Sequence, residues 1–489
     1  MNYQSTRNHR LQASSAAAVL EGIAADGGLY IRDDLSTMNF DWKGLLGEDS
    51  LTMSARILSA LLPDIPDMET LVKQGYEGKF ETDELTPLAQ VGDRYVLELF
   101  RGPTSAFKDV ALSLLPRLIT SAKTVCGVDD EIVILTATSG DTGKAALEGF
   151  RDVDRTKILV FYPDGGVSEI QKLQMVTQEG RNVGVCAVRG NFDDAQTGVK
   201  QIFGDKAFAA ELSQRGWFLS SANSINWGRL LPQIVYYFSA YCDAVTGGMI
   251  AMGDKLNFVV PTGNFGDILA GWYAKEMGLP VGKLVCASNA NNVLTDFIRT
   301  GTYNKNRPFH TTASPSMDIL VSSNLERLLY ALCGSDTEVA GYMQQLREQG
   351  SYTVSDELKA KIQATFAGGF CNDIQTREKI GHAWRDHRYL IDTHTAVAYH
   401  VLEDYRSETG DATPAVVVST ASPFKFCDQV LRGIGGTADA FGPALIRRLS
   451  CETQIDAPAP LTGLDARPVR FGGCVDKAQM LHTVDEFLK

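Results

Sequence analysis

Residues 102–109, with the sequence GPTSAFKD, place a lysine where its amine could act as a nucleophile. A Gly-Pro pair sets a turn, Thr104 and Ser105 supply hydroxyls, and Lys108 stands where an apolar run over 110–118 begins to look helical. The positive end of a helix dipole disfavours an ammonium group, so a nucleophilic neutral amine is easier to reach there. Such a lysine can form a Schiff base. The alternative is a solvated lysine in a first helical turn, which is the commoner case for an arbitrary lysine.

A glycine-containing loop, GNFGD at 263–267, lies between a strand-like run and a helix-like run. In that position free backbone N–H groups and the helix dipole can bind a phosphate, and glycine lets the backbone approach it closely. The loop matches neither the dinucleotide G-x-G-x-x-G pattern nor a P-loop. Taken alone it is a weak signal, and an ordinary turn between strand and helix remains the alternative.

A second loop, SGDTGK at 139–144, also follows a strand-like run and opens a helix. It is not a P-loop, because Thr138 stands where the first glycine is required and Ala145 where a Ser or Thr is required. We interpret it as a second anion site in which Ser139 and Thr142 face a substrate carboxylate or phosphate; taken alone, a plain turn between strand and helix is an equally good interpretation. Asp141 is unsuited to direct anion contact, so we expect it to cap the helix or to orient neighbouring hydroxyls.

A polar stretch over 223–229 opens the next long helix. Arg229 could bind a substrate phosphate through two parallel hydrogen bonds. Asn226 lies on the same polar stretch. Capping residues followed by a surface arginine are an equally good interpretation. Lys425 and Arg189 are weaker candidates for the phosphate contact.

The elements that must position these residues alternate between strands and helices, which indicates parallel sheets covered on both faces. Strands are predicted over 95–100, 131–137, 157–162, 183–188, 218–221, 256–260, 284–287 and 415–419. Helices are predicted over 16–24, 51–62, 109–126, 142–150, 168–179, 192–203, 225–242, 268–277 and 475–488. We therefore expect an α/β fold with a mostly helical N-terminal region (1–90), one lobe over 91–245 and a second over 246–489, the second carrying a helical insertion at about 304–390.

Composition narrows the class of protein. The chain has 489 residues, 44% of them hydrophobic, and a formal net charge of −13, which opposes binding to nucleic acid or an anionic membrane. No apolar run reaches the roughly 20 residues that span a bilayer, and residues 2–10 are polar where a signal peptide would be apolar. These features favour a cytoplasmic protein.

Cysteine and histidine spacing argues against a metal site. The nine cysteines form no C-x-x-C pair and stand mainly in apolar runs, so we expect buried thiols. Neither His382 with His387 nor His394 with His400 has the i, i+4 spacing that places two ligands on one helix face. We predict no protein-bound metal.

Several motifs in order along the chain resemble one family. They are YQSTRN at 3–8, AVLEGIAADGGLY at 18–30, GPTSAFKD at 102–109, TSGDTG at 138–143, NSINWGRLLPQ at 223–233, PTGNFGD at 261–267, SPSMDI at 314–319 and STASPFKF at 419–426. Together they resemble threonine synthase, a pyridoxal-phosphate enzyme of fold type II with a tryptophan synthase beta-like fold. The resemblance covers nearly the whole chain.

The resemblance implies roles for individual residues. Lys108 would be the catalytic lysine that carries pyridoxal 5′-phosphate, and Gly263, Asn264, Phe265, Gly266 and Asp267 would bind its phosphate. Thr420 would meet the pyridine nitrogen, where a hydroxyl makes the ring a milder electron sink than a carboxylate would. Those expected to contact substrate are Ser105, Ser139, Asp141, Thr142, Asn226 and Arg229. The family usually has His where this chain has Ser422.

The implied reaction is conversion of O-phospho-L-homoserine and water to L-threonine and phosphate, by γ-elimination and β-replacement, as the last step of threonine biosynthesis. We expect a monomer or small homo-oligomer that acts on this small molecule. A fold type II dehydratase or phospholyase is the near alternative, because it would share the lysine and the phosphate loop. A catalytically silent binding protein is the distant one.

Overall fold

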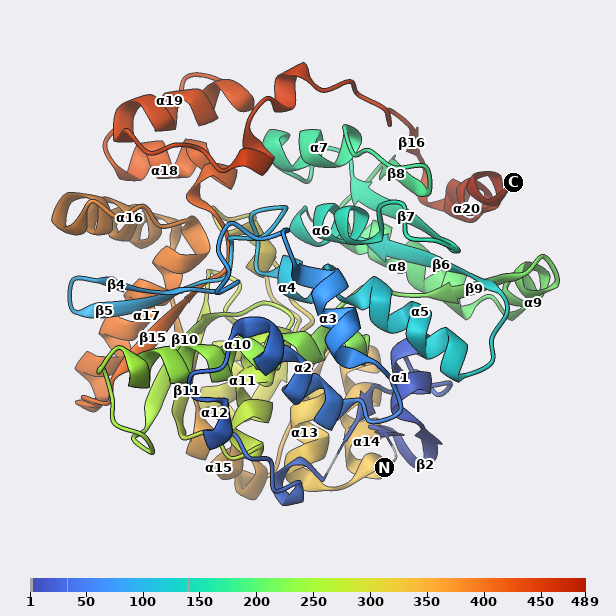
Figure 1. Ribbon diagram of the computed structural model, residues 1–489, viewed down its shortest axis with the longest axis horizontal. Helices are drawn as coiled ribbons and strands as arrows, with labels where there is room; N and C mark the ends of the chain where they lie inside the picture. Colours follow the sequence, from blue (N-terminus) through green and yellow to red (C-terminus); the bar gives the residue numbers. More distant parts are fainter. Residues whose placement is uncertain (1–2, 33, 139) are drawn as a thin grey trace.

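Two largely parallel β-sheets organise the chain in the computed structural model, which describes residues 3–32, 34–138 and 140–489. In Figure 1 the strands of the larger sheet lie to the left, those of the smaller sheet lie to the upper right, and helix α10 (Trp227–Thr246) runs near the centre. The α/β class with parallel sheets that the sequence predicts is confirmed.

The larger sheet has six strands in the order β14-β11-β10-β15-β5-β4. Only the edge strand β4 runs antiparallel to its neighbour. The strands are β4 (Leu88–Val91), β5 (Arg94–Glu98), β10 (Leu256–Pro261), β11 (Val281–Ser288), β14 (Phe366–Phe370) and β15 (Ala415–Ser419). Both faces of this sheet are covered, as is usual for parallel sheets, and every residue of β10 is buried.

The smaller sheet has five parallel strands in the order β16-β8-β7-β6-β9. They are β6 (Glu131–Ala137), β7 (Thr156–Pro163), β8 (Val183–Val188), β9 (Trp217–Ser220) and β16 (Cys474–Val475). The run predicted as one C-terminal helix over 475–488 thus begins as part of a strand, and its helix is α20 (Met480–Leu488).

Alternate residues of the central strands belong to different cores, because successive side chains of a strand point to opposite faces. In β10, Phe258 and Val260 join a large core that also contains α10, whereas Val259 packs with the helices on the opposite face. In β6, Ile134 joins the large core, whereas Val133 packs toward α20. The large core therefore lies between the two sheets and joins them.

Helices cover the outer faces and fill the centre. Those before residue 250 are α1 (Ser15–Glu21), α2 (Ser50–Leu61), α3 (Met68–Tyr76), α4 (Lys108–Leu112), α5 (Leu115–Val125), α6 (Asp141–Phe150), α7 (Glu169–Val176), α8 (Phe192–Gly204), α9 (Lys206–Gln214) and α10. Those after it are α11 (Gly266–Glu276), α12 (Val293–Thr300), α13 (Leu325–Cys333), α14 (Asp336–Glu348), α15 (Asp356–Thr365), α16 (Asp373–His387), α17 (Thr393–Thr409), α18 (Cys427–Gly433), α19 (Pro443–Thr453) and α20.

The strand β5 lies in a different sheet from the one expected, because the sequence-based division placed all of 91–245 in one lobe. β5 pairs with β15, so the strand before the lysine loop lies in the larger sheet, while the helices that follow the loop lead to the smaller one. The single helix predicted over 109–126 is two helices, α4 and α5, with Pro116 in the first turn of the second. The lysine loop therefore crosses from one sheet to the other.

Two further regions contain strands that the sequence did not predict. The N-terminal region, predicted mostly helical, begins with an antiparallel sheet of β1 (Tyr3–Ser5), β2 (Asn8–Ala13) and β3 (Tyr30–Ile31). The insertion supplies β14, whose sequence FAGGF lacks the usual strand signature because of its glycines. A Cβ at Gly369 would lie 2.7 Å from Val401 of α17, so glycine is required where the helix crosses this strand. The insertion also holds a short pair, β12 (Thr302–Asn304) with β13 (Ser351–Thr353).

The cysteines only partly match the expectation of buried thiols. Five are buried, but Cys126 and Cys451 are exposed, and Cys333 and Cys474 are partly exposed. None of the helices in the described part of the chain combines the length and apolarity needed to cross a membrane. On α20, His482, Asp485 and Glu486 lie within metal-binding distance of one another, although both carboxylates already pair with Lys489.

Candidate active site

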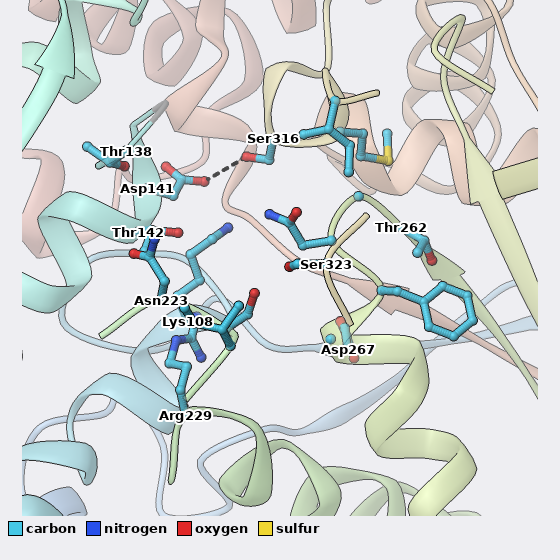
Figure 2. Close-up of a pocket in the computed structure, with 18 of the residues that line it drawn as sticks. Lys108, Thr138, Asp141, Thr142, Asn223, Arg229, Thr262, Asp267, Ser316 and Ser323 are labelled. Carbon is cyan, nitrogen blue, oxygen red and sulfur yellow. Dashed lines mark hydrogen bonds between the residues drawn. The ribbon is translucent and has the colours of Figure 1, made fainter. Parts of the chain in front are cut away.

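A cavity lies where loops from both sheets meet, at the carboxyl ends of β6, β10 and β15. In open parallel sheets this is the usual position of a ligand site. Figure 2 shows the labelled residues: Thr138, Asp141 and Thr142 on one side, Thr262 and Asp267 on the other, and Lys108 and Arg229 below and between them. The sheets thus bring together residues far apart in sequence.

The lysine loop is held by its own last residue. Asp109 is buried, and its carboxylate accepts hydrogen bonds from the Thr104 N–H at 2.8 Å and from the Thr104 hydroxyl. A Cβ at Gly102 would lie 2.5 Å from the Asp109 Cβ, so the turn needs glycine there. Burial raises the pKa of Asp109 to about 6, against the opposing effect of the Thr104 hydrogen bonds. Asp109 was not among the predicted site residues, and it fixes the loop that carries the lysine.

Lys108 is the first residue of α4, as predicted, and lines the cavity. Its ammonium lies 4.3 Å from the centre of the Phe107 ring, and no carboxylate of the described residues lies within ion-pair distance. Burial lowers the pKa of Lys108 to about 8; the Asp141 carboxylate acts in the opposite direction, and the cation of Arg229 adds to the lowering. The site therefore makes the neutral, nucleophilic form of the amine easier to reach than it is for a lysine in water.

The 263–267 loop presents backbone N–H groups to the cavity. Its carbonyls are bound elsewhere: that of Gly263 by the Ser322 hydroxyl at 2.9 Å, and that of Asn264 by the backbone and side chain of Asn324, both at 3.1 Å. Among the described residues, the N–H groups of residues 263–266 have no acceptor. They stand at the N-terminus of α11, where four donors and the helix dipole suit a phosphate.

Asp267, the last residue of that loop, faces the tyrosines of α10 as well as the cavity. One carboxylate oxygen accepts hydrogen bonds from the Tyr236 and Tyr237 hydroxyls, at 2.6 and 2.8 Å. Burial raises the pKa of Asp267 to about 6. The carboxylate thus ties α11 to α10, and the phosphate-binding character of the loop comes from its backbone.

Asp141 and Thr142, from the second glycine loop, line the cavity, while Ser139 lies outside the described residues. Asp141 is the first residue of α6 and does not cap it. Its carboxylate lies 2.7 Å from the Lys425 ammonium and accepts a hydrogen bond from Gln171 at 2.9 Å. The Ser316 hydroxyl lies 3.5 Å from it (Figure 2). Burial would raise the pKa of Asp141, but Lys425 and Lys108 together hold it well below its usual range.

This ion pair changes the predicted role of Lys425. The side chain is completely buried, and its ammonium also donates to the Thr104 carbonyl at 3.0 Å. It therefore holds the lysine loop against α6 and is not free to bind a substrate phosphate. Arg189, the other weak candidate, is exposed, pairs with Asp476 and does not line the cavity.

Arg229 is a buried cation for which the described residues provide no ion-pair partner. It comes from the first turn of α10 and is 3% exposed, and two of its guanidinium nitrogens, Nε and Nη1, have no hydrogen-bond acceptor among the described residues. Burial lowers the pKa of Arg229 to about 10. A buried charge left unpaired is costly, so an anion in the cavity would stabilise this side chain.

Two of the residues predicted to contact substrate do not line the cavity. The Asn226 side chain accepts the Gly228 N–H as the N-cap of α10 and donates to the Val19 and Ser221 carbonyls, so its polar atoms are used within the fold. Ser105 is buried in a left-handed conformation, with φ of 60°, and its hydroxyl has no hydrogen-bond partner among the described residues. Its carbonyl accepts the Ser422 N–H at 3.1 Å.

Thr420 directly follows β15 and lines the cavity, as its predicted role requires. Its carbonyl accepts the Phe107 N–H at 2.8 Å, which places it beside the lysine loop. Ser422, where the sequence departs from the family pattern, uses its hydroxyl to cap the turn over 423–425 by accepting the Phe424 N–H at 3.3 Å.

His394 is a cavity residue that the sequence analysis considered only as a metal ligand. Its Nδ1 lies 2.6 Å from the buried Asp392 carboxylate, and its Nε2 accepts the Ser316 N–H at 3.2 Å. This arrangement requires a proton on Nδ1 and none on Nε2. An Asp two residues before a His at a helix start was the available signal. The pair holds the 314–317 segment, and with it Ser316, over the cavity.

Two family models match the chain. One is described as threonine synthase N terminus and matches residues 2–76, and the other as threonine synthase, C-terminal, and matches residues 395–484.

Relatives align over most of the chain. A threonine synthase of Pseudomonas aeruginosa is 40% identical over 443 residues, which cover 89% of this chain and 91% of that protein. Threonine synthase-like 1 of Macaca fascicularis is 39% identical over 432 residues; the aligned part is 85% of this chain but only 57% of that longer relative. The crystal structure of a PLP-bound threonine synthase from Brucella melitensis superposes with a TM-score of 0.85 at 36% identity, covering 100% of this chain and 98% of that one.

Proposed function

The chain belongs to the threonine synthase family, and on that premise we propose that it converts O-phospho-L-homoserine and water to L-threonine and phosphate, with pyridoxal 5′-phosphate as cofactor. It is then a lyase of threonine biosynthesis. The observation that carries the proposal is one cavity that contains an amine of lowered pKa, a loop of unbonded backbone N–H groups and a buried, unpartnered arginine. The reaction needs two phosphate sites beside one amine, and this set of groups supplies them.

The residues present fit the cofactor. Lys108 would hold the aldehyde carbon of the cofactor, and the N–H groups of residues 263–266 would bind its phosphate. The Thr420 hydroxyl would meet its pyridine nitrogen. When bound, pyridoxal phosphate supplies the electron sink that stabilises negative charge at the substrate Cα. The Thr420 hydroxyl cannot keep a full positive charge on the ring nitrogen, so Thr420 moderates that sink.

The chain's own groups bind the substrate and move its protons. Arg229 binds the substrate phosphate and holds it as it leaves from Cγ. Lys108, as a neutral amine, takes the proton from Cα and later returns one. Thr142 and the loop around it bind the substrate carboxylate. Asp141 is neutralised by Lys425 and therefore does not repel these anions. His394 positions Ser316 at the edge of the cavity.

The test is a product balance with the purified protein, added pyridoxal phosphate and O-phospho-L-homoserine. Equal amounts of phosphate and threonine are expected, with no reaction of L-serine or L-threonine. Phosphate accompanied by a 2-oxo acid would indicate a phospholyase instead, and reaction of only the unphosphorylated amino acids would indicate a dehydratase. Lys108→Ala should lose turnover and the cofactor absorbance together, and an active, coloured variant would exclude the assigned lysine.

We also propose that the protein acts in the cytoplasm on this small molecule, as a monomer or small homo-oligomer and without nucleic acid. The net charge of −13 supports the last point, since nucleic-acid binding relies on cationic contacts to phosphates. Cysteines that are all free support a reducing compartment. Light scattering coupled to gel filtration would give the oligomeric state.

A further inference from the structure

A second cavity, of about 470 Å³, lies on the other side of the lysine loop and shares no residue with the candidate active site. Five segments form it: the turn after α3, the lysine loop at Pro103, the region of α5, the region of α6, and the C-terminal segment around 459–467. Its size falls within the range of sites for small molecules. No role for it follows from the proposed function.

The walls of this cavity are strongly cationic in a protein whose net charge is −13. Glu148 is the single carboxylate among the lining residues, and the five cations are Lys79, Arg117, Lys144, Arg151 and Arg467. Glu148 is already shared, since it lies 3.2 Å from Lys144 and 3.1 Å from Arg151. The cavity therefore has an excess of positive charge that its own residues do not neutralise.

Three of the cations, Lys79, Arg117 and Arg467, have no carboxylate within ion-pair distance in the described ranges. Within the described part of the chain, Lys79 donates only to the Gln74 carbonyl at 2.9 Å, and Arg467 only to the Thr462 carbonyl at 3.3 Å. The Nε of Arg117 is buried without any acceptor among the described residues. Donors from three separate segments thus lack an anionic partner.

The charges also act on one another. Burial lowers the pKa of Lys79 to about 8, and the cations of Arg117 on α5 and Arg151, which directly follows α6, lower it further, while Glu148 on α6 raises it. Like charges gathered in a concave site raise the local concentration of counter-ions. A bound anion would relieve this repulsion and raise the pKa of Lys79, so that the amine would take up a proton from solvent.

We propose that this cavity is a binding site for a small anion that carries two or more phosphate groups. Three unpaired cations on different walls call for more than one negative charge. A tetrahedral phosphate accepts hydrogen bonds from several directions, whereas a carboxylate accepts them in one plane, and guanidinium groups bind phosphate through paired hydrogen bonds. A long polyanion is disfavoured by the repulsion of the rest of the surface.

The experiment is isothermal titration of the cofactor-loaded protein with inorganic pyrophosphate at low ionic strength. One pyrophosphate per chain should bind at this cavity, and binding should weaken as salt is added. Arg117→Gln and Arg467→Gln, which lie on different segments of the cavity lining, should each raise the dissociation constant at least tenfold. Arg181→Gln is the matched control, because Arg181 has a 94% exposed side chain and lies outside both cavities. At pH 8 wild-type binding should take up protons, seen as a dependence of the measured heat on the buffer.

Each other outcome overturns the proposal. Failure of wild type to bind millimolar pyrophosphate would exclude the site. If both variants bound pyrophosphate as tightly as wild type, the anion would bind elsewhere, for example in the candidate active site. Citrate that bound as tightly as pyrophosphate would exclude the phosphate assignment. Thermal unfolding of the two variants without ligand shows whether each is folded, and two substitutions on different elements keep the test decisive if one of them unfolds.

Discussion

The ammonium group of Lys425 lies 2.7 Å from the carboxylate of Asp141, and the two side chains are 0% and 2% exposed. Lys425 follows β15 of the larger sheet, and Asp141 follows β6 of the smaller one. Lys425 also donates to the Thr104 carbonyl in the lysine loop. One buried ion pair therefore joins the three loops that form the cavity.

Lys425→Met should destabilise the protein by about 3–5 kcal/mol, because removing one partner of a buried ion pair leaves the other charge unpaired. Urea unfolding at pH 7 measures the change. Asp141→Asn should also destabilise, whereas the double variant should lose less than the sum of the two, by about 1 kcal/mol or more. Strictly additive losses would show that the pair is not coupled. Because the pKa of Asp141 is lowered in the folded state, its carboxylate adds to the free energy of unfolding at pH values above the unfolded pKa of about 3.9. This contribution is lost progressively as the pH falls from about 3.9 through the lower pKa of the folded state.

The Lys108 amine of the cofactor-free protein should titrate near pH 8, because burial lowers its pKa to about 8. Between pH 8 and the unfolded value of about 10.4, the folded state then binds fewer protons than the unfolded state. This group's contribution to the free energy of unfolding therefore rises with pH across that window and is least favourable below pH 8. Competitive acetylation followed by mass spectrometry of the Lys108 peptide measures the titration. The same peptide in urea is the control, and identical profiles would refute the shift.

Arg229→Gln should raise KM for O-phospho-L-homoserine by about tenfold to a hundredfold, since a hydrogen bond to a charged group contributes about 1.5–3 kcal/mol. The cofactor absorbance should persist. Arg229→Lys should restore only part of the affinity, because an ammonium lacks the planar pair of donors. Inhibition by inorganic phosphate should weaken in parallel. Arg181→Gln is the surface control. If Arg229→Gln kept the wild-type KM, as this control should, the substrate phosphate would bind elsewhere.

Gly263→Ala should lower the affinity for pyridoxal phosphate by about tenfold. The added Cβ would lie 2.8 Å from the Ser316 carbonyl oxygen, so the loop must shift, and overpacking of this kind costs about 1–3 kcal/mol. Absorbance titration of the cofactor-free variant gives the dissociation constant. Gly341→Ala in α14 is the control, because its Cβ meets nothing within 4 Å. Unchanged cofactor binding by Gly263→Ala would mean that the loop is not the phosphate site.

The sequence was most informative where structure and chemistry are local. Lys108 at the start of α4, and glycine loops that join β6 to α6 and β10 to α11, follow from turn residues and apolar runs only a few residues long. The backbone N–H groups of the 263–267 loop are likewise a local feature, because the loop itself supplies them.

The sequence failed where partners come from distant segments. Asp141 and Lys425 are 284 residues apart, so the sequence could not show that one neutralises the other and that Lys425 is unavailable to substrate. The placement of β5 in the larger sheet and the approach of α17 to Gly369 depend likewise on strand order and packing.

The sequence by itself determined that the fold is α/β and placed a lysine at a helix start and two glycine loops between strands and helices, from which it predicts a reactive lysine and two anion sites. Only the tertiary structure decided that Asn226 is used as a cap, that His394 holds Ser316 over the cavity, and that two buried nitrogens of Arg229 find no acceptor among the described residues. The physical reason is that local patterns set the conformation of a segment, whereas the charge and hydrogen-bonding state of a buried group depend on what the fold packs against it.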